Sequence, residues 1–151
     1  MKIWIQNLQK HTPLNSGKIR KAARTILAEL GSPEAELSIV FVDDSRIREL
    51  NRRYLRRDKP TNVLAFSMTE GEFPILHPRL LGDLVISVET AERQSNRFGL
   101  SAGGMVLLLL IHGILHLLGY DHVRSRKKAR EMAEKQKELF RLVLQHSSLT
   151  K

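Results

Sequence analysis

Three histidines form the group of side chains in this sequence whose spacing points most directly to chemistry. His112 and His116 stand four residues apart in an apolar segment, and His122 follows six residues later. On a helix, residues four apart share one face and lie about 6 Å apart along the axis. Gly119 can adopt the left-handed conformation that ends a helix and turns the chain back. The pattern therefore predicts that three imidazoles converge on one ion.

A metal ion explains these histidines better than a hydrophobic core does. Three buried imidazoles without a shared partner would cost about 1–3 kcal/mol each in unsatisfied polar groups. The sequence contains no cysteine, which excludes thiolate ligands. Three neutral imidazoles that leave a fourth position open are typical of a catalytic zinc, and cellular availability favours zinc over copper or nickel. We expect one Zn²⁺ per chain, held by His112, His116 and His122.

The histidine spacing also matches the metzincin protease motif, H-E-x-x-H-x-x-G-x-x-H, except at one position. The glutamate that acts as general base in that motif is Gly113 here. A glycine cannot accept a proton from a water molecule. The sequence therefore argues against the usual peptidase mechanism.

Three motifs resemble those of the YbeY family of bacterial endoribonucleases. The signature H-G-x-L-H-L-x-G-Y-D-H occurs intact at His112–His122, and Asp58–Phe66 (DKPTNVLAF) and Gly82–Ser87 (GDLVIS) fit as well. The resemblance implies a metzincin-like core with one zinc. It also implies single-strand-specific RNA cleavage in 16S rRNA maturation and ribosome quality control, with the small ribosomal subunit as partner. One position departs from the family, where Leu55 replaces a frequent arginine; Arg56 or Arg57 is expected to substitute for it.

The segment from Arg52 to Lys59 (RRYLRRDK) carries five positive charges and one negative charge. It is either a phosphate clamp or a solvated helix end. As a clamp it predicts Arg56 as a catalytic contact to the scissile phosphate. Asp121 is the second candidate catalytic residue, as a carboxylate that orients a histidine or as a general base, although a helix cap is the simpler role. The residues expected to bind RNA are Arg52, Arg53, Arg57 and Lys59.

The composition fits one basic domain over residues 1–151. The formal net charge of +9 favours a polyanionic partner, with RNA expected and DNA not, although basic proteins that bind no nucleic acid are common. Only 5% of residues are aromatic, which argues against a base-stacking platform. The first residues alternate as a strand does, rather than as a secretory signal does, and the apolar run Met105–Leu118 falls short of the roughly 20 residues that span a bilayer. We expect a cytoplasmic protein without a membrane partner.

The elements that must position these residues can be read from hydrophobic spacing. Four segments have the pattern of strands: Lys2–Asn7, Glu36–Val42, Asn62–Met68 and Leu81–Val88. Five have the pattern and end signals of helices: Ser16–Leu30, Asp43–Tyr54, Glu89–Phe98, Ser101–Leu118 and Ser125–Gln145. Gly82 predicts a bulge or a close backbone approach inside the fourth strand. Together they predict an α+β fold in which a small, mostly parallel four-stranded sheet packs with about five helices around a central apolar helix.

Three functions remain open from the sequence. The first is a zinc-dependent endoribonuclease that acts on ribosomal RNA. The second is a non-catalytic, RNA-binding ribosome assembly factor whose metal is structural, which the glycine at position 113 keeps open. The third is a metallohydrolase with another substrate, which the positive charge disfavours.

Overall fold

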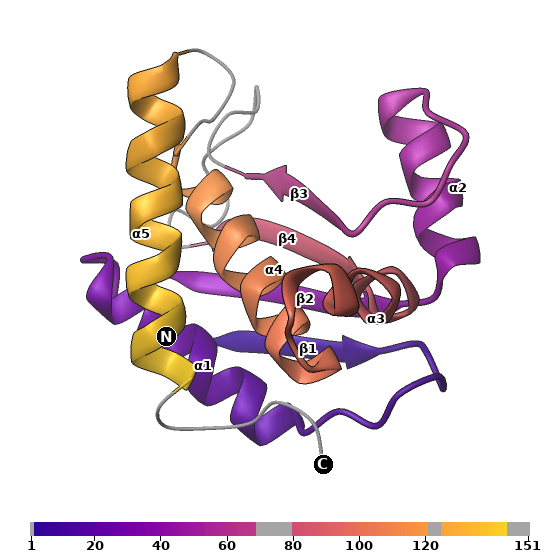
Figure 1. Ribbon diagram of the computed structural model, residues 1–151, viewed down its shortest axis with the longest axis horizontal. Helices are drawn as coiled ribbons and strands as arrows, with labels where there is room; N and C mark the ends of the chain where they lie inside the picture. The colour runs from indigo at the N-terminus through magenta and orange to yellow at the C-terminus, as the bar shows by residue number, and fades with distance from the viewer. Residues whose placement is uncertain (1, 69–79, 121–124, 145–151) are drawn as a thin grey trace.

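The computed structural model describes residues 2–68, 80–120 and 125–144, which form a sheet with most of its helices on one face (Figure 1). The sheet order is β1-β2-β4-β3, with β1, β2 and β4 parallel and β3 antiparallel at one edge. The predicted α+β fold with a mostly parallel four-stranded sheet is therefore confirmed. In chain order the elements are β1 (Ile3–Asn7), α1 (Ser16–Glu29), β2 (Glu36–Val42), α2 (Asp44–Leu55), β3 (Val63–Ser67), β4 (Leu80–Ser87), α3 (Val88–Ser95), the 3₁₀ turn η1 (Asn96–Phe98), α4 (Ala102–Leu117) and α5 (Arg126–Leu144).

The strands divide their side chains between two hydrophobic clusters because successive residues of a strand point to opposite faces. Leu84 and Ile86 of β4 face the main core, which they form with α1, α4 and α5. Val85, between them, faces a smaller cluster that α2 closes with Ile47. As predicted, α4 lies at the centre and is buried nearly all round. Full burial of one such apolar side chain is worth about 1.5–3 kcal/mol, so α4 contributes much of the stability of the fold.

The helix ends follow side-chain caps. Asn15 caps α1 by accepting a hydrogen bond from the amide of Lys18, and Ser101 caps α4 by accepting one from Gly104, each at 3.0 Å. Ser87 caps α3 in the same way, which is why α3 begins at Val88, a residue that the hydrophobic pattern places in the preceding strand. The predicted helix Glu89–Phe98 is also not uniform, since its last turn tightens into η1.

Gly82 combines the two features that the sequence predicted for it. The pairing of β2 with β4 shifts register at this point, where Glu36 pairs with Leu80 and Leu37 with Gly82. A Cβ atom on Gly82 would lie 2.1 Å from the carbonyl oxygen of Phe66 on β3, and its φ of 152° is unfavourable for other residues. The bulge and the close backbone approach are therefore both confirmed.

A second close contact brings α4 down onto β4. A Cβ atom on Gly113 would lie 2.7 Å from Cδ2 and 3.1 Å from Cδ1 of Leu84, and Leu84 is fully buried. Position 113 thus points into the sheet, where the packing leaves no room for a longer side chain. Close packing against Leu84 therefore explains why a glycine stands at the position that a glutamate occupies in the metzincin motif.

Asp44 joins the start of α2 to α3. One carboxylate oxygen accepts hydrogen bonds from the hydroxyls of Ser87 and Thr90, at 2.7 and 2.6 Å, and the other accepts one from Arg93 at 2.6 Å. Burial by itself would raise the pKa of Asp44, but the bonds from Thr90, Ser87 and Arg93 outweigh it and hold the pKa below its ordinary value. The carboxylate is therefore part of the connection between the two helices.

Within the described ranges, no single helix is both long and apolar enough to cross a membrane. The segments Val88–Phe98 and Ala102–Leu117 pass that test only as a pair, and they meet at an angle of 105°. Most residues of α4 are buried in the hydrophobic core.

We predict that Gly113→Ala lowers the free energy of unfolding by about 1 kcal/mol. Alanine gains about 1 kcal/mol in helix propensity, but forcing a methyl group against Leu84 costs about 1–3 kcal/mol. Urea denaturation would measure the difference, and the double variant with Leu84→Val should recover part of it. Gly17→Ala is the matched control, because a Cβ there meets only Asn15 Oδ1, at 3.4 Å. A Gly113→Ala protein at least as stable as the parent would contradict the packing argument.

We predict that Asp44→Asn lowers the free energy of unfolding at neutral pH by about 1–3 kcal/mol, since hydrogen bonds to a charged group are removed. A carboxyl whose folded pKa is depressed stabilises the protein above its unfolded value, here 3.8, and that contribution disappears as the pH falls through the folded pKa. The difference in stability between parent and variant should therefore begin to shrink as the pH falls below 3.8 and disappear only when the pH lies below the folded pKa of Asp44. Asp58→Asn, an exposed carboxylate paired with Arg48, is the control. A stability difference that persists in acid would contradict this role of the charge.

Candidate functional site

His112 and His116 meet on the surface of α4, as their spacing predicted. Their Nε2 atoms lie 3.1 Å apart, and their ring centroids are separated by 4.6 Å. Two nitrogens that each bind zinc at 2.0–2.1 Å with a tetrahedral angle are about 3.3 Å apart. The observed separation fits that geometry closely. These two imidazoles therefore fit a shared metal ion.

A glutamine on another helix holds the first imidazole. Nδ1 of His112 lies 2.9 Å from Oε1 of Gln136 on α5. Because an amide oxygen only accepts hydrogen bonds, Nδ1 carries the proton and donates it, which leaves a lone pair on Nε2. This is the tautomer that a ligand through Nε2 requires. Sequence reasoning missed Gln136, since nothing in its spacing marks it.

The two imidazoles line a hollow of about 580 Å³ between α4 and β3. The hollow combines apolar strand residues with a few polar groups, which is the usual composition of a ligand site. Lys128 of α5 places a basic group at its edge. The residues that line it include Leu55, Val63, Ala65, Phe66, Ser67, Gly119, Tyr120 and Lys128.

The predicted third ligand, His122, and the predicted catalytic Asp121 lie outside the described residues. Gly119 has a φ of 94° and follows the end of α4, so the predicted glycine turn is confirmed. Within residues 2–68, 80–120 and 125–144, no three His, Cys, Asp or Glu side chains form a metal site. The described part of the site is a pair of histidines and the glutamine that orients one of them.

The basic run Arg52–Lys59 divides into two groups. Arg52 and Arg53 turn to Glu49, at 2.5 and 3.6 Å, and the bond from Arg52 holds the pKa of Glu49 below its ordinary value. Arg57 and Lys59 instead line a second groove, of about 980 Å³. The four residues predicted to bind RNA are therefore not equivalent.

Arg56, the predicted catalytic residue, caps the C-terminus of α2. It adopts a left-handed backbone with a φ of 57°, and its amide donates to the carbonyl of Arg52 at 3.1 Å. It does not line the histidine hollow, whereas its neighbour Leu55 does. The fold brings Leu55, rather than Arg56, to the position beside the imidazoles.

Similarity to known proteins agrees with the fold and the motif. A family model described as endoribonuclease YbeY matches residues 4–143. Among similar proteins, an endoribonuclease YbeY from Geobacter metallireducens is 46% identical over 144 residues, which cover 95% of this chain and 96% of the relative. One from Syntrophotalea carbinolica is 48% identical over 139 residues and covers 91% of this chain and 93% of the relative.

A solved structure gives the same result at the level of the fold. The solution structure of a Thermotoga maritima protein superposes with a TM-score of 0.66 at 28% identity, and the match covers 93% of this chain and 88% of that one. The family model spans most of the chain, and the curated relatives match it along nearly their whole length. The chain therefore belongs to the endoribonuclease YbeY family.

Proposed function

We propose that this chain is a zinc-dependent, single-strand-specific endoribonuclease that matures 16S rRNA and acts in ribosome quality control, with His112, His116 and His122 as the metal ligands. The observation that carries the proposal is the approach of the two Nε2 atoms to 3.1 Å at the edge of a hollow. The family's endoribonuclease activity supplies the substrate class. We further propose that it works in the cytoplasm as one domain of residues 1–151, with the small ribosomal subunit as its partner.

The chain's own residues prepare this site for a cation. Gln136 keeps the Nδ1 proton on His112 and so directs the Nε2 lone pair towards His116. A zinc ion held by the three histidines would supply Lewis-acid chemistry, since it polarises a phosphoryl oxygen and makes water more acidic. The hollow of about 580 Å³ beside the imidazoles offers space for the scissile phosphate.

The positive groups around the hollow would hold the negative substrate. Lys128 lines the hollow itself and can neutralise a phosphate there. Arg57 and Lys59 lie in the adjoining groove, and Leu55 lines both spaces. Arg52 and Arg53 would first have to exchange Glu49 for a phosphate. Arg56 as a phosphate contact and Asp121 as a catalytic or orienting carboxylate stay predictions.

Gly113 limits how the proton transfers can be arranged. Glycine has no side chain that could accept a proton, so the residue after His112 cannot serve as a general base. A side chain added at this position would meet Leu84. The general base must therefore be another group of the site or of the RNA itself. The proposal is therefore RNA hydrolysis without the glutamate of the metzincin proteases.

We predict that His116→Ala loses both metal and RNase activity. Elemental mass spectrometry of untagged protein should find about one zinc per chain in the parent and almost none in the variant, because one of three protein ligands is gone. Cleavage of a single-stranded RNA should fall by at least about a hundredfold, since removing a single group that stabilises the transition state already costs roughly that much.

His11→Ala is the matched control, because His11 is exposed and pairs with Glu92. It should keep both the zinc and the activity. Metal-free parent protein, verified by elemental analysis, that still cleaves RNA at the full rate would refute the metal-dependent mechanism. Cleavage restored by added zinc would support it.

We predict that Gln136→Leu weakens zinc binding by about 10–100-fold, because the acceptor that orients His112 is removed. Competition with a chromophoric chelator measures the affinity, and ¹⁵N NMR of His112 reports its tautomer. Gln136→Glu keeps an acceptor oxygen and should retain most of the affinity. Gln6→Leu, an exposed glutamine on β1, is the surface control. An unchanged zinc affinity in Gln136→Leu, measured beside a parent that binds zinc, would remove Gln136 from the site.

A further inference from the structure

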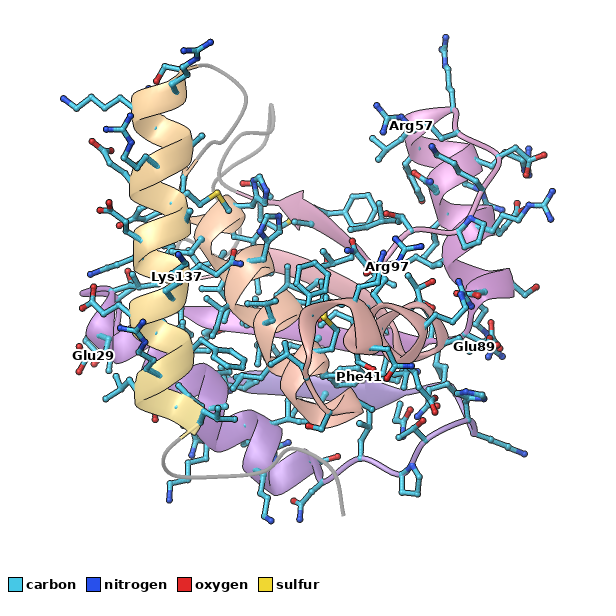
Figure 2. All side chains as sticks on the ribbon, viewed as in Figure 1. Glu29, Phe41, Arg57, Glu89, Arg97 and Lys137 are labelled. Atoms are coloured by element: carbon cyan, nitrogen blue, oxygen red, sulfur yellow. The ribbon has the colours of Figure 1, made fainter. Side chains whose placement is uncertain are left out.

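A second groove opens beside the histidine hollow, between the end of α2, the loop that leads into β3, and α3 with η1. Its volume is about 980 Å³. Figure 2 labels Arg57 on the segment that ends α2 and Arg97 on η1, which lie on opposite sides of this space. The charge pattern of the sequence points to the first side only, because α3 and η1 lie far along the chain from α2.

The charged side chains among the described residues that line this groove are all positive. Four cationic side chains line it, namely Arg57, Lys59, Arg93 and Arg97, together with neutral amides and apolar residues, and among the described residues no acidic side chain lines it. Arg93 is paired with Asp44, whereas Arg57, Lys59 and Arg97 form no ion pair with any acidic residue in the described part of the chain. The nearest carboxylate in sequence, Asp58, is turned to Arg48 at 2.8 Å. The groove therefore presents uncompensated positive charge.

Side-chain hydrogen bonds hold the walls of the groove in place. Asn51, which is buried, donates to the carbonyl of Lys59 at 2.9 Å and so ties the loop to α2. Asn62 donates to Gln94 Oε1 at 3.1 Å and ties the start of β3 to α3. The Asp44 network joins α2 to α3 at the far end. Because two of these contacts connect the walls and the third holds the loop against α2, the backbone that carries the positive groups is in place before a ligand binds.

The groove continues the histidine hollow. Leu55, Asn62, Val63 and Leu64 line both spaces, so the end of α2 and the start of β3 form a common wall. A strand whose phosphate lies at the imidazoles can therefore run directly into the groove. No aromatic side chain of the described ranges lines it, and base stacking is consequently not its means of binding.

We propose that this groove, with Arg57 and Lys59 on one wall and Arg97 on the other, binds the sugar-phosphate backbone of the RNA strand that flanks the scissile bond. Guanidinium groups suit phosphate, and a groove of cations and amides without aromatic rings follows a backbone irrespective of sequence. The inference rests on the proposed endoribonuclease function and extends it: the enzyme recognises several nucleotides on one side of the cut, with little base preference there.

Arg97→Glu tests this proposal, because Arg97 is exposed and lies outside the histidine hollow. Steady-state cleavage by zinc-loaded protein would be measured with a single-stranded RNA of about 12 nucleotides and with a trinucleotide, which cannot occupy both spaces. For the long RNA, KM should rise about tenfold, and the slope of log(kcat/KM) against log salt concentration should weaken by about 0.7 for each phosphate that is no longer neutralised. For the trinucleotide, the change should be much smaller. Arg97→Lys keeps the charge and should restore most of the affinity.

Arg24→Glu is the matched control, since it makes the same charge change at an exposed site on α1. Equal effects of Arg24→Glu and Arg97→Glu would assign the loss to net charge and overturn the groove. An equal loss for long and short RNA, or an unchanged KM and salt slope for the long RNA, would also overturn it. In each of these cases the parent still cleaves RNA. A parent that cleaves neither RNA would instead refute the proposed function on which the groove depends.

Discussion

The close contact between α4 and β4 decides where the imidazoles can lie. Gly113 lets the helix approach Leu84 so nearly that a Cβ would already clash, and this fixes the rotation of α4 against the sheet. With that rotation set, the helical period of 3.6 carries His112 and His116 to the same side, towards β3 and α5. The glycine between them therefore has two consequences: it positions the ligand pair, and it removes the place that a catalytic glutamate occupies in the related protease motif.

Two histidines on one helix do not by themselves make a site, because each ring can rotate and each has two tautomers. Here the second contact comes from α5, whose Gln136 accepts the hydrogen bond from Nδ1 of His112. The same helix contributes Met132, Leu139 and Val143 to the core, so the glutamine is held by the packing of its neighbours. The position of the imidazole thus depends on residues buried along the same face of α5 as Gln136, a helix that the histidine motif does not include.

Hydrophobic spacing and caps are sufficient to predict the strands, the helices and the central place of α4, and Gly82 predicts the bulge, because these features depend on residues near one another in the chain. The approach of His112 to His116 is predictable for the same reason. Gln136 and Arg97 are not, since their importance comes from contacts between elements that no local period relates. The apolar character of Val88 fits a strand as well as a helix. Val88 begins α3 because the Ser87 side chain caps the helix at the preceding position.

The basic residues show why a charge run alone does not identify a binding surface. Arg52 and Arg57 look alike in the sequence, yet one is bound to Glu49 on its own helix and the other faces a groove that no carboxylate of the described residues lines. An exposed ion pair contributes little to stability, but it does neutralise a cation that would otherwise attract phosphate. The positive electrostatic potential is concentrated where α2 meets α3 and η1. There, positive groups from two distant segments share one concave surface that leads to the imidazoles. The net charge of +9 becomes a directed attraction only because the fold gathers part of it on this path.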